Sequence, residues 1–297
     1  MSSTVWAVAL FAHNEARTIQ AAVESVLAAS DGRIVHIAVL ANGCTDDTVA
    51  IVRKTAAEQS AVLAVEIPRA DKANAWNVYV HDVLRDERFA SASLHAFMDG
   101  DVRAEPGAIA ALHHALNDVP TAHAAGGMPV TGRDRDAWRQ RMVAGGTLAG
   151  NLYALRASFV SRLRGQGVRI PIGLIGEDWL VSYLARTDLR VPPVSDGHPR
   201  VVFTPRAGFW FRSLNPLNPR DCRIYARRLW RYALRGAQFE MLMPLLERES
   251  LAGMPRDVDE LYRRGGLPSR MKWTGRMSIL RTLAIQHIRI RRRAGHV

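Results

Sequence analysis

Apolar runs of strand length alternate with helical segments in the first part of the chain, and this alternation constrains the fold most. Four such runs each precede a polar turn and a segment of helical periodicity: Val5–Phe11, Ile34–Leu40, Ala61–Ile67 and Leu94–Met98. Strands joined through helices in this way run parallel, with right-handed crossovers. We therefore predict an α/β fold with a mainly parallel, Rossmann-like sheet that is flanked by helices.

Polar residues follow all four predicted strands. The first strand runs into His13-Asn14-Glu15, the second into Asn42, the third toward Lys72 and the fourth into Asp99-Gly100-Asp101. The ligand crevice of an open α/β sheet lies outside the carboxyl ends of its strands. We therefore expect these residues to converge on one site.

Asp99 and Asp101 are separated only by Gly100. Two carboxylates this close repel each other and lose solvation when buried, unless a cation compensates them. Mg²⁺ or Mn²⁺ carrying a diphosphate would do so, because these cations bind through one or two carboxylates plus phosphate oxygens. Gly100 would leave space for a close ligand. The alternative is an acidic turn, since Asp-Gly is a common turn dipeptide.

The positive charge is concentrated at the end of the chain. The net charge is +12, but residues 261–297 hold ten Lys and Arg and no acid, while the rest has 30 basic and 28 acidic residues. A near-neutral body argues against a nucleic-acid partner.

The sequence shows no sign of export or membrane insertion. We find no apolar run long enough to span a membrane, and the N-terminus lacks the positive region of a signal peptide. Cys44 and Cys222 fit free thiols in a reducing compartment. We expect a cytoplasmic protein.

The second half carries another pair of acids, Glu177 and Asp178, at the start of a predicted helix. Acids at a helix N-terminus are favoured by its dipole alone, so a purely structural role is the alternative to a catalytic one. We also predict strands or short elements at residues 122–130, 150–156, 200–204 and 208–212, and an arginine-rich helical region from about Pro219 onward.

With these residues in place, the chain resembles family 2 glycosyltransferases of the GT-A fold. Five segments resemble motifs of that family in the family's order: Phe11-Ala12-His13-Asn14-Glu15-Ala16, Asn42-Gly43-Cys44-Thr45-Asp46-Asp47-Thr48, Lys72-Ala73-Asn74-Ala75-Trp76-Asn77, Asp99-Gly100-Asp101 and Gly176-Glu177-Asp178-Trp179. The resemblance covers roughly residues 4–215. It implies a GT-A domain over 1–215, with a nucleotide-binding half to about 130 and an acceptor half from 131, and a helical C-terminal extension over 216–297.

The resemblance also implies a role for each matching residue. The nucleotide donor would contact Phe11, Ala12, His13, Glu15, Asn42, Lys72, Asp99 and Gly100, with Asn42 at the base edge and Lys72 near the phosphates. Asp99 and Asp101 would hold Mn²⁺ or Mg²⁺. Asp178 would be the general base, with Glu177 as its acceptor-binding neighbour. A histidine often completes the metal site in related enzymes; our candidate is His198, with a surface-loop residue as the alternative.

The function implied is inverting transfer from a nucleotide sugar, with UDP-sugars favoured, to a glycan, lipid-linked or small-molecule acceptor. Family members usually carry two acidic residues after the second strand, where this chain has Ala41-Asn42. The identity of the donor's nucleobase is therefore less certain. The Q-x-x-R-W motif of processive members is absent, which indicates non-processive transfer.

Two other functions compete with this one. A sugar nucleotidyltransferase would need a G-x-G-T-R segment after the first strand, and Ala12-His13-Asn14-Glu15 does not provide it. A basic protein that binds nucleic acid or a membrane surface would leave Asp99, Asp101, Glu177 and Asp178 unexplained.

The tail suggests a further partner. Met277, Leu280, either Leu283 or Ala284, and Ile288 would share one side of a helix, with Arg281, Arg289 and Arg292 on another. Such a basic amphipathic helix is typical of peripheral contact with an anionic membrane. The alternative is a terminal helix that docks its apolar side on the protein.

Overall fold

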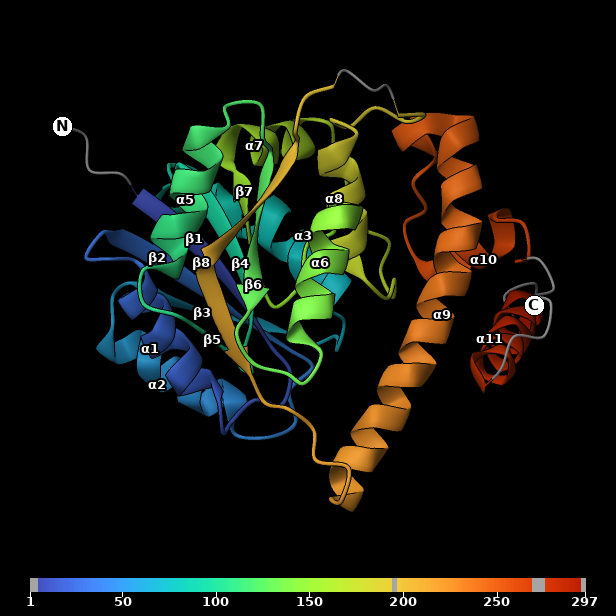
Figure 1. Ribbon diagram of the computed structural model, residues 1–297, viewed down its shortest axis with the longest axis horizontal. Coiled ribbons are helices and arrows are strands. Elements are labelled where there is room, and N and C mark those ends of the chain that lie inside the picture. The colour runs from blue at the N-terminus through green and yellow to red at the C-terminus, as the bar shows by residue number, and fades with distance from the viewer. Residues whose placement is uncertain (1–4, 194–196, 269–275, 295–297) are drawn as a thin grey trace. The chain divides into compact units, whose positions relative to one another are not determined.

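A computed structural model describes residues 5–193, 197–268 and 276–294 (Figure 1). The chain divides into two compact units. The described part of the first comprises residues 5–168, 177–189 and 197–213, and that of the second comprises 169–176, 190–193, 214–268 and 276–294. The predicted domain boundary at 215 stays a prediction.

The first unit is built on one sheet of eight strands in the order β3-β2-β1-β4-β7-β6-β8-β5. The strands are β1 Val5–Ala12, β2 Ile34–Asn42, β3 Val62–Ile67, β4 Leu94–Asp99, β5 Val102–Ala104, β6 Ala124–Pro129, β7 Leu152–Arg156 and β8 Val201–Phe211. The four predicted strands, β1 to β4, pair in parallel as expected. Beyond them β7 runs antiparallel to both β4 and β6, while β6 and β8 are parallel.

Two details of the sheet differ from the prediction. The two strands expected over residues 200–212 are one continuous strand, β8, whose pairing with β6 shifts register between Gly126 and Met128. The segment around Pro205 therefore bulges, since proline cannot donate to a ladder, and this break divides the sequence pattern in two. The short strand β5, directly after Asp101, was not predicted and pairs with β8.

Helices cover both faces of the sheet (Figure 1). Those of the first unit are α1 Ile19–Ala29, α2 Thr48–Glu58, α3 Lys72–His81, the 3-10 helix η1 Val83–Arg85, α4 Glu87–Ala90, α5 Ala108–Asp118, α6 Arg135–Gly145, α7 Ala157–Gly165 and α8 Glu177–Arg186. The helices α1, α2 and α5 share one buried core with alternate residues of β1. Helices α3 and α7 pack together; α3 also packs against β1 and β2, and α7 against β4 and β7.

An aromatic layer anchors α3. Phe97 of β4 stacks on Tyr153 of β7 at a centroid distance of 4.8 Å, and Trp76 and Tyr79 of α3 pack against the same ring. Trp76 also donates a hydrogen bond from Nε1 to the Tyr153 hydroxyl at 3.1 Å. Asp71 caps the helix by accepting from the Asn74 backbone N–H at 2.8 Å. Lys72, the first residue of α3, is thereby held in place.

The second unit contains α9 Pro219–Glu249, the 3-10 helix η2 Ser250–Gly253, α10 Val258–Arg264 and α11 Arg276–Ala294. Helix α11 packs on α9 and α10. It buries Ala284 and Ile288 completely, and Arg281 pairs with Glu240 at 2.5 Å.

The expected contact of the tail with a membrane is therefore not supported. Ala284 and Ile288 are buried within the unit and Leu280 is partly buried, which follows the docking alternative, while Leu283 is 52% exposed; the side chain of Met277 lies outside the described residues. Within the described ranges, no helix is both long and apolar enough to cross a membrane.

Candidate active site

The fourth strand delivers the Asp99-Gly100-Asp101 turn to the carboxyl edge of the sheet. Gly100 is buried, and its N–H donates to the carbonyl oxygen of Phe11 at 2.7 Å. A Cβ at this position would lie 2.9 Å from the same oxygen. The close approach of the β1 backbone therefore requires glycine at position 100, and the expectation that Gly100 also leaves space for a ligand stays a prediction.

Lys72 lies at the centre of the site. Its Nζ is 2.5 Å from Oδ1 of Asp99 and 2.8 Å from Oε1 of Glu177. The ammonium also donates to the carbonyl oxygen of Gly150 at 3.3 Å and lies 5.2 Å from the centre of the Phe11 ring. Residues far apart in the sequence thus meet at one cation.

The local field keeps this lysine charged. Burial by itself would lower the pKa of Lys72, because it disfavours the ammonium. Three carboxylates outweigh burial and raise the pKa well above its ordinary value; they belong to Asp99, Glu177 and Asp178.

The surroundings of Asp99 disfavour its charged form. Burial raises the pKa of this carboxyl to about 6, and repulsion from Asp101 and Glu177 adds to the effect, although Lys72 opposes it. The site thus holds more negative charge than one lysine compensates, and it has the electrostatics of a cation-binding site.

Helix α8 contributes Glu177 and Asp178, which differ in burial and in their partners. Glu177 is 5% exposed and its carboxylate faces Lys72. Asp178 is half-buried; its Oδ2 accepts from the Gly150 N–H at 2.9 Å and its Oδ1 from the Trp179 N–H at 2.9 Å.

The sequence analysis missed the part that Gly150 plays. Its N–H binds Asp178 while its carbonyl oxygen binds Lys72. A Cβ there would lie 2.9 Å from Lys72 Nζ and 3.3 Å from Asp178 Oδ2. A side chain at this position would therefore displace one of the two groups.

The first and second strands end in the residues expected at the nucleoside. Phe11 is 4% exposed and Ala12 is fully buried, while His13 is exposed and donates from Nδ1 to the Asn42 carbonyl oxygen at 2.7 Å. Asn42 is 4% exposed, and its Nδ2 donates to the carbonyl oxygens of Ala12 and Leu40 at 2.9 and 3.2 Å. The expected contact of Asn42 with a base stays a prediction, and it would have to use the side-chain oxygen.

The turn carboxylates suit a divalent cation that arrives with its substrate. In the part of the chain that the structure describes, no group of three or more His, Cys, Asp or Glu side chains could hold a metal ion. Asp99 and Asp101 offer two hard oxygen ligands, which is the number that Mg²⁺ commonly takes from a protein when phosphates supply the rest. The donor set fits Mn²⁺ or Mg²⁺ on that condition.

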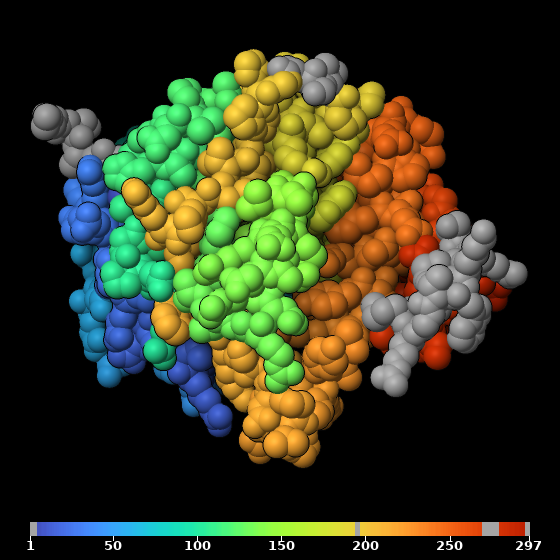
Figure 2. Space-filling model, viewed as in Figure 1, coloured from blue at the N-terminus to red at the C-terminus, as the bar shows by residue number. Residues whose placement is uncertain are grey.

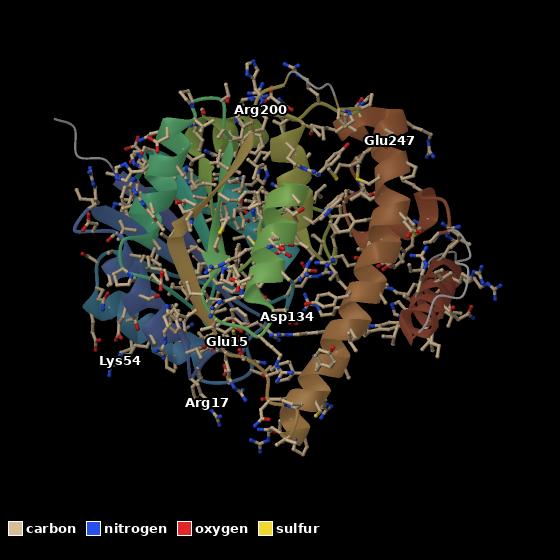
Figure 3. The ribbon with its side chains drawn as sticks, in the orientation of Figure 1. Glu15, Arg17, Lys54, Asp134, Arg200 and Glu247 are labelled. Atoms are coloured by element: carbon tan, nitrogen blue, oxygen red, sulfur yellow. The ribbon has the colours of Figure 1, made fainter. Side chains whose placement is uncertain are left out.

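His198 does not lie near these carboxylates. His198 precedes β8, whose first residue, Val201, pairs with Ala124 of β6. Ala124 also pairs with Leu155 of β7, which in turn pairs with a residue near the amino end of β4. His198 therefore lies toward the amino end of β4, whereas Asp99 lies at its carboxyl end. In Figure 3 Arg200, two residues after His198, lies at the opposite end of the sheet from Glu15. The topology therefore contradicts the prediction of His198 as a metal ligand.

The model of the family described as Glycosyl transferase family 2 matches residues 7–172. The chain belongs to glycosyl transferase family 2. No curated protein matched the sequence.

Several solved structures have a similar fold. A mannosyltransferase from Pyrobaculum calidifontis, PcManGT in complex with GDP-Man and Mn²⁺, is 19% identical with a TM-score of 0.57 over 78% of this chain and 61% of its own. Glucosyl-3-phosphoglycerate synthase from Mycobacterium tuberculosis, in complex with Mn²⁺, UDP-glucose and phosphoglyceric acid, is 18% identical with a TM-score of 0.53 over 86% of this chain and 81% of its own. TarS 1–349 from S. aureus is 15% identical with a TM-score of 0.52 over 98% and 91%.

These findings confirm two predictions. The protein is an enzyme of the glycosyltransferase class, and its fold is that of GT-A glycosyltransferases. The chain spans 61% of the length of the mannosyltransferase. Family membership does not identify the donor, the metal or the acceptor of this family 2 glycosyltransferase, so these must be inferred from its own residues.

Glu15 gives the ligand-free enzyme a pH dependence that can be tested. Burial raises the pKa of Glu15 from 4.5 to about 7, with repulsion from Asp101, Asp99 and Asp46 and an opposing hydrogen bond from Thr18. Between these two values the native state binds more protons than the unfolded state, so this residue makes stability fall as pH rises.

We therefore expect Glu15→Gln to unfold at the same urea concentration as wild type near pH 4.5 and to be more stable at pH 8. The gain should be about 1 kcal/mol, since Glu15 is partly exposed and solvent screens its charge. Urea titrations at both pH values measure it, with the exposed Glu247 (Figure 3) changed to Gln as the control. A stability difference that does not change with pH would contradict the assignment.

Proposed function

We propose that this family 2 glycosyltransferase is a non-processive, inverting enzyme that uses a nucleotide-diphosphate sugar. The observation that supports the proposal is the convergence of Asp99, from the donor-side motif, and Glu177, from the acceptor-side motif, on the ammonium of Lys72. One site can then hold the leaving group and the attacking hydroxyl on two sides of the anomeric carbon. Such an arrangement reduces the entropic cost of direct displacement.

The donor side would be formed by Lys72, Asp99 and Asp101. Lys72 stays protonated, so its ammonium can bind a diphosphate. Mn²⁺ or Mg²⁺ would be held by Asp99 and Asp101, and when bound it neutralises charge on the leaving diphosphate. We propose a UDP-sugar as donor, because Asn42 keeps an oxygen that can accept from the N–H of a uracil; guanine offers a similar N–H and is the alternative.

We propose Asp178 as the general base and Glu177 as a residue that positions the acceptor. Asp178 is the more exposed of the two, and its hydrogen bonds to backbone N–H groups favour the ionised carboxylate that a base requires. Glu177 is almost fully buried and its charge is compensated by Lys72. Its carboxylate is thus less accessible to an incoming hydroxyl than that of Asp178.

The acceptor would be a hydroxyl of a glycan, a lipid-linked molecule or a small molecule, and we expect the enzyme to act in the cytoplasm. Family membership argues against the non-enzymatic alternative and gives no support to a nucleotidyltransferase.

The first test separates Asp178 from Glu177. We expect Asp178→Asn to bind the donor and Mn²⁺ as wild type does, because Asn keeps an oxygen for the Gly150 N–H. It should transfer sugar roughly 10²–10⁴ times more slowly, since it has lost the proton acceptor. Glu177→Gln should reduce transfer less and mainly raise the KM for the acceptor.

Initial-rate kinetics with isothermal titration of the donor distinguish these outcomes. Wild-type turnover in Asp178→Asn with an inactive Glu177→Gln would transfer the base role to Glu177. Wild-type turnover in both would leave the acids of α8 with a structural role only.

The second test concerns the metal ion and the nucleobase of the donor. We expect UDP-sugars to raise the melting temperature of the wild type more with Mn²⁺ than without it, and more than GDP-sugars do. Asp101→Ala should abolish the Mn²⁺ enhancement and reduce transfer by several orders of magnitude, because charge on the leaving group is no longer compensated. Asp118→Ala, an exposed carboxylate at the end of α5, should behave as wild type. Full Mn²⁺ enhancement in Asp101→Ala would place the metal elsewhere, and greater stabilisation by GDP-sugars would favour guanine.

A further inference from the structure

The first half of α9 carries arginines that the unit does not neutralise. Six arginines occur between Pro219 and Arg235, of which four are exposed and two partly exposed: Arg220, Arg223, Arg227, Arg228, Arg231 and Arg235. None of the six forms an ion pair within the described parts of the chain. The same stretch has one acid, Asp221, which is 2% exposed and accepts from the Asn215 N–H at 2.8 Å.

Several other arginines of the unit form ion pairs with carboxylates. Arg281 of α11 pairs with Glu240, and Arg291 pairs with Asp259 at 2.7 Å. Arg264 of α10 pairs with both Glu249 and Glu260. Within the described residues, Arg263 of α10 and Arg289, Arg292 and Arg293 of α11 also lack a carboxylate partner, but the first half of α9 holds six such arginines.

Large apolar and aromatic side chains are exposed in the same place. Leu217, just before the helix, is 90% exposed, and Ile224, Tyr225 and Tyr232 are 37%, 57% and 49% exposed. Ile224, Arg228, Arg231 and Arg235 recur at the spacing of one helix face, and the two tyrosines lie directly beside them. Figure 2 shows this part of α9, coloured amber to orange, at the molecular surface.

We propose that the first half of α9 is a docking surface for an anionic lipid membrane. Arginine binds lipid phosphates, and tyrosine is enriched at the depth of the headgroups, where its ring is partly buried and its hydroxyl stays hydrated. Leu217 and Ile224 favour a membrane over nucleic acid, because a phosphate backbone would satisfy the arginines but leave these aliphatic groups in water. The inference does not depend on the proposed donor, metal or base.

The test uses the full chain and vesicles of equimolar phosphatidylglycerol and phosphatidylcholine, with pure phosphatidylcholine for comparison. We expect wild type to sediment with the anionic vesicles only, and less at high salt. Arg227→Gln/Arg228→Gln/Arg231→Gln should weaken this binding at least tenfold. The matched control, Arg289→Gln/Arg291→Gln/Arg293→Gln in α11, removes the same charge and should bind within twofold of wild type.

A second variant separates insertion from charge alone. Tyr225→Ser/Tyr232→Ser keeps every arginine and should weaken vesicle binding several-fold if the rings enter the headgroup layer. All variants should keep the wild-type circular dichroism spectrum and melting temperature, because the substituted side chains lie at the surface.

Three outcomes would overturn the proposal. Equal loss by the two triple variants would mean non-specific charge attraction, and loss by the α11 variant alone would return the contact to the tail. Absence of vesicle binding, together with binding of a short single-stranded oligonucleotide that the α9 triple variant weakens, would make the surface a nucleic-acid site.

Discussion

The ion pairs of Lys72 with Asp99 and Glu177 are the interaction on which the rest of the candidate site depends. Two acidic segments brought to one edge of a sheet would repel each other, and Glu177 is buried too deeply for water to compensate its charge. A shared ammonium offsets part of this repulsion. Burial and the remaining repulsion from Asp101 and Glu177 still raise the pKa of Asp99, and a divalent cation would relieve this effect. Lys72 and Asp99 thus hold the site together and are also residues that we propose bind the donor.

The fold supplies this arrangement through packing. Phe97 and Tyr153 stack under α3 and fix the helix that begins at Lys72, while the contact between Gly100 and Phe11 joins the turn after β4 to β1. Gly150 completes the site by binding Lys72 with its carbonyl oxygen and Asp178 with its N–H. A buried aromatic layer and two glycines therefore determine where the charged groups lie.

Much of this could be predicted from the sequence, because hydrophobic periodicity identifies strands and helices, and parallel strands bring their carboxyl ends together. Asp99, Lys72 and the α/β architecture were predictable on these grounds, whereas the role of Glu177 was implied only by the resemblance to the family. The role of Gly150 and the position of His198, which was predicted wrongly, depend on which strands pair antiparallel. No local sequence pattern encodes this pairing. Net charge was equally uninformative about the tail, since the partners of Arg281 and Arg291 lie far away in the sequence.

A double-mutant cycle on Lys72→Met and Glu177→Gln tests the central claim most directly. We expect Lys72→Met alone to lower the free energy of unfolding by about 3 kcal/mol, because it leaves buried carboxylates without their cation. The double variant should lose less than the sum of the single losses, by about 1–3 kcal/mol, as residues in one charge network do. Lys72→Met combined with Glu247→Gln should be additive. Additivity within about 0.5 kcal/mol in the first cycle as well would show that Lys72 does not hold the two motifs together.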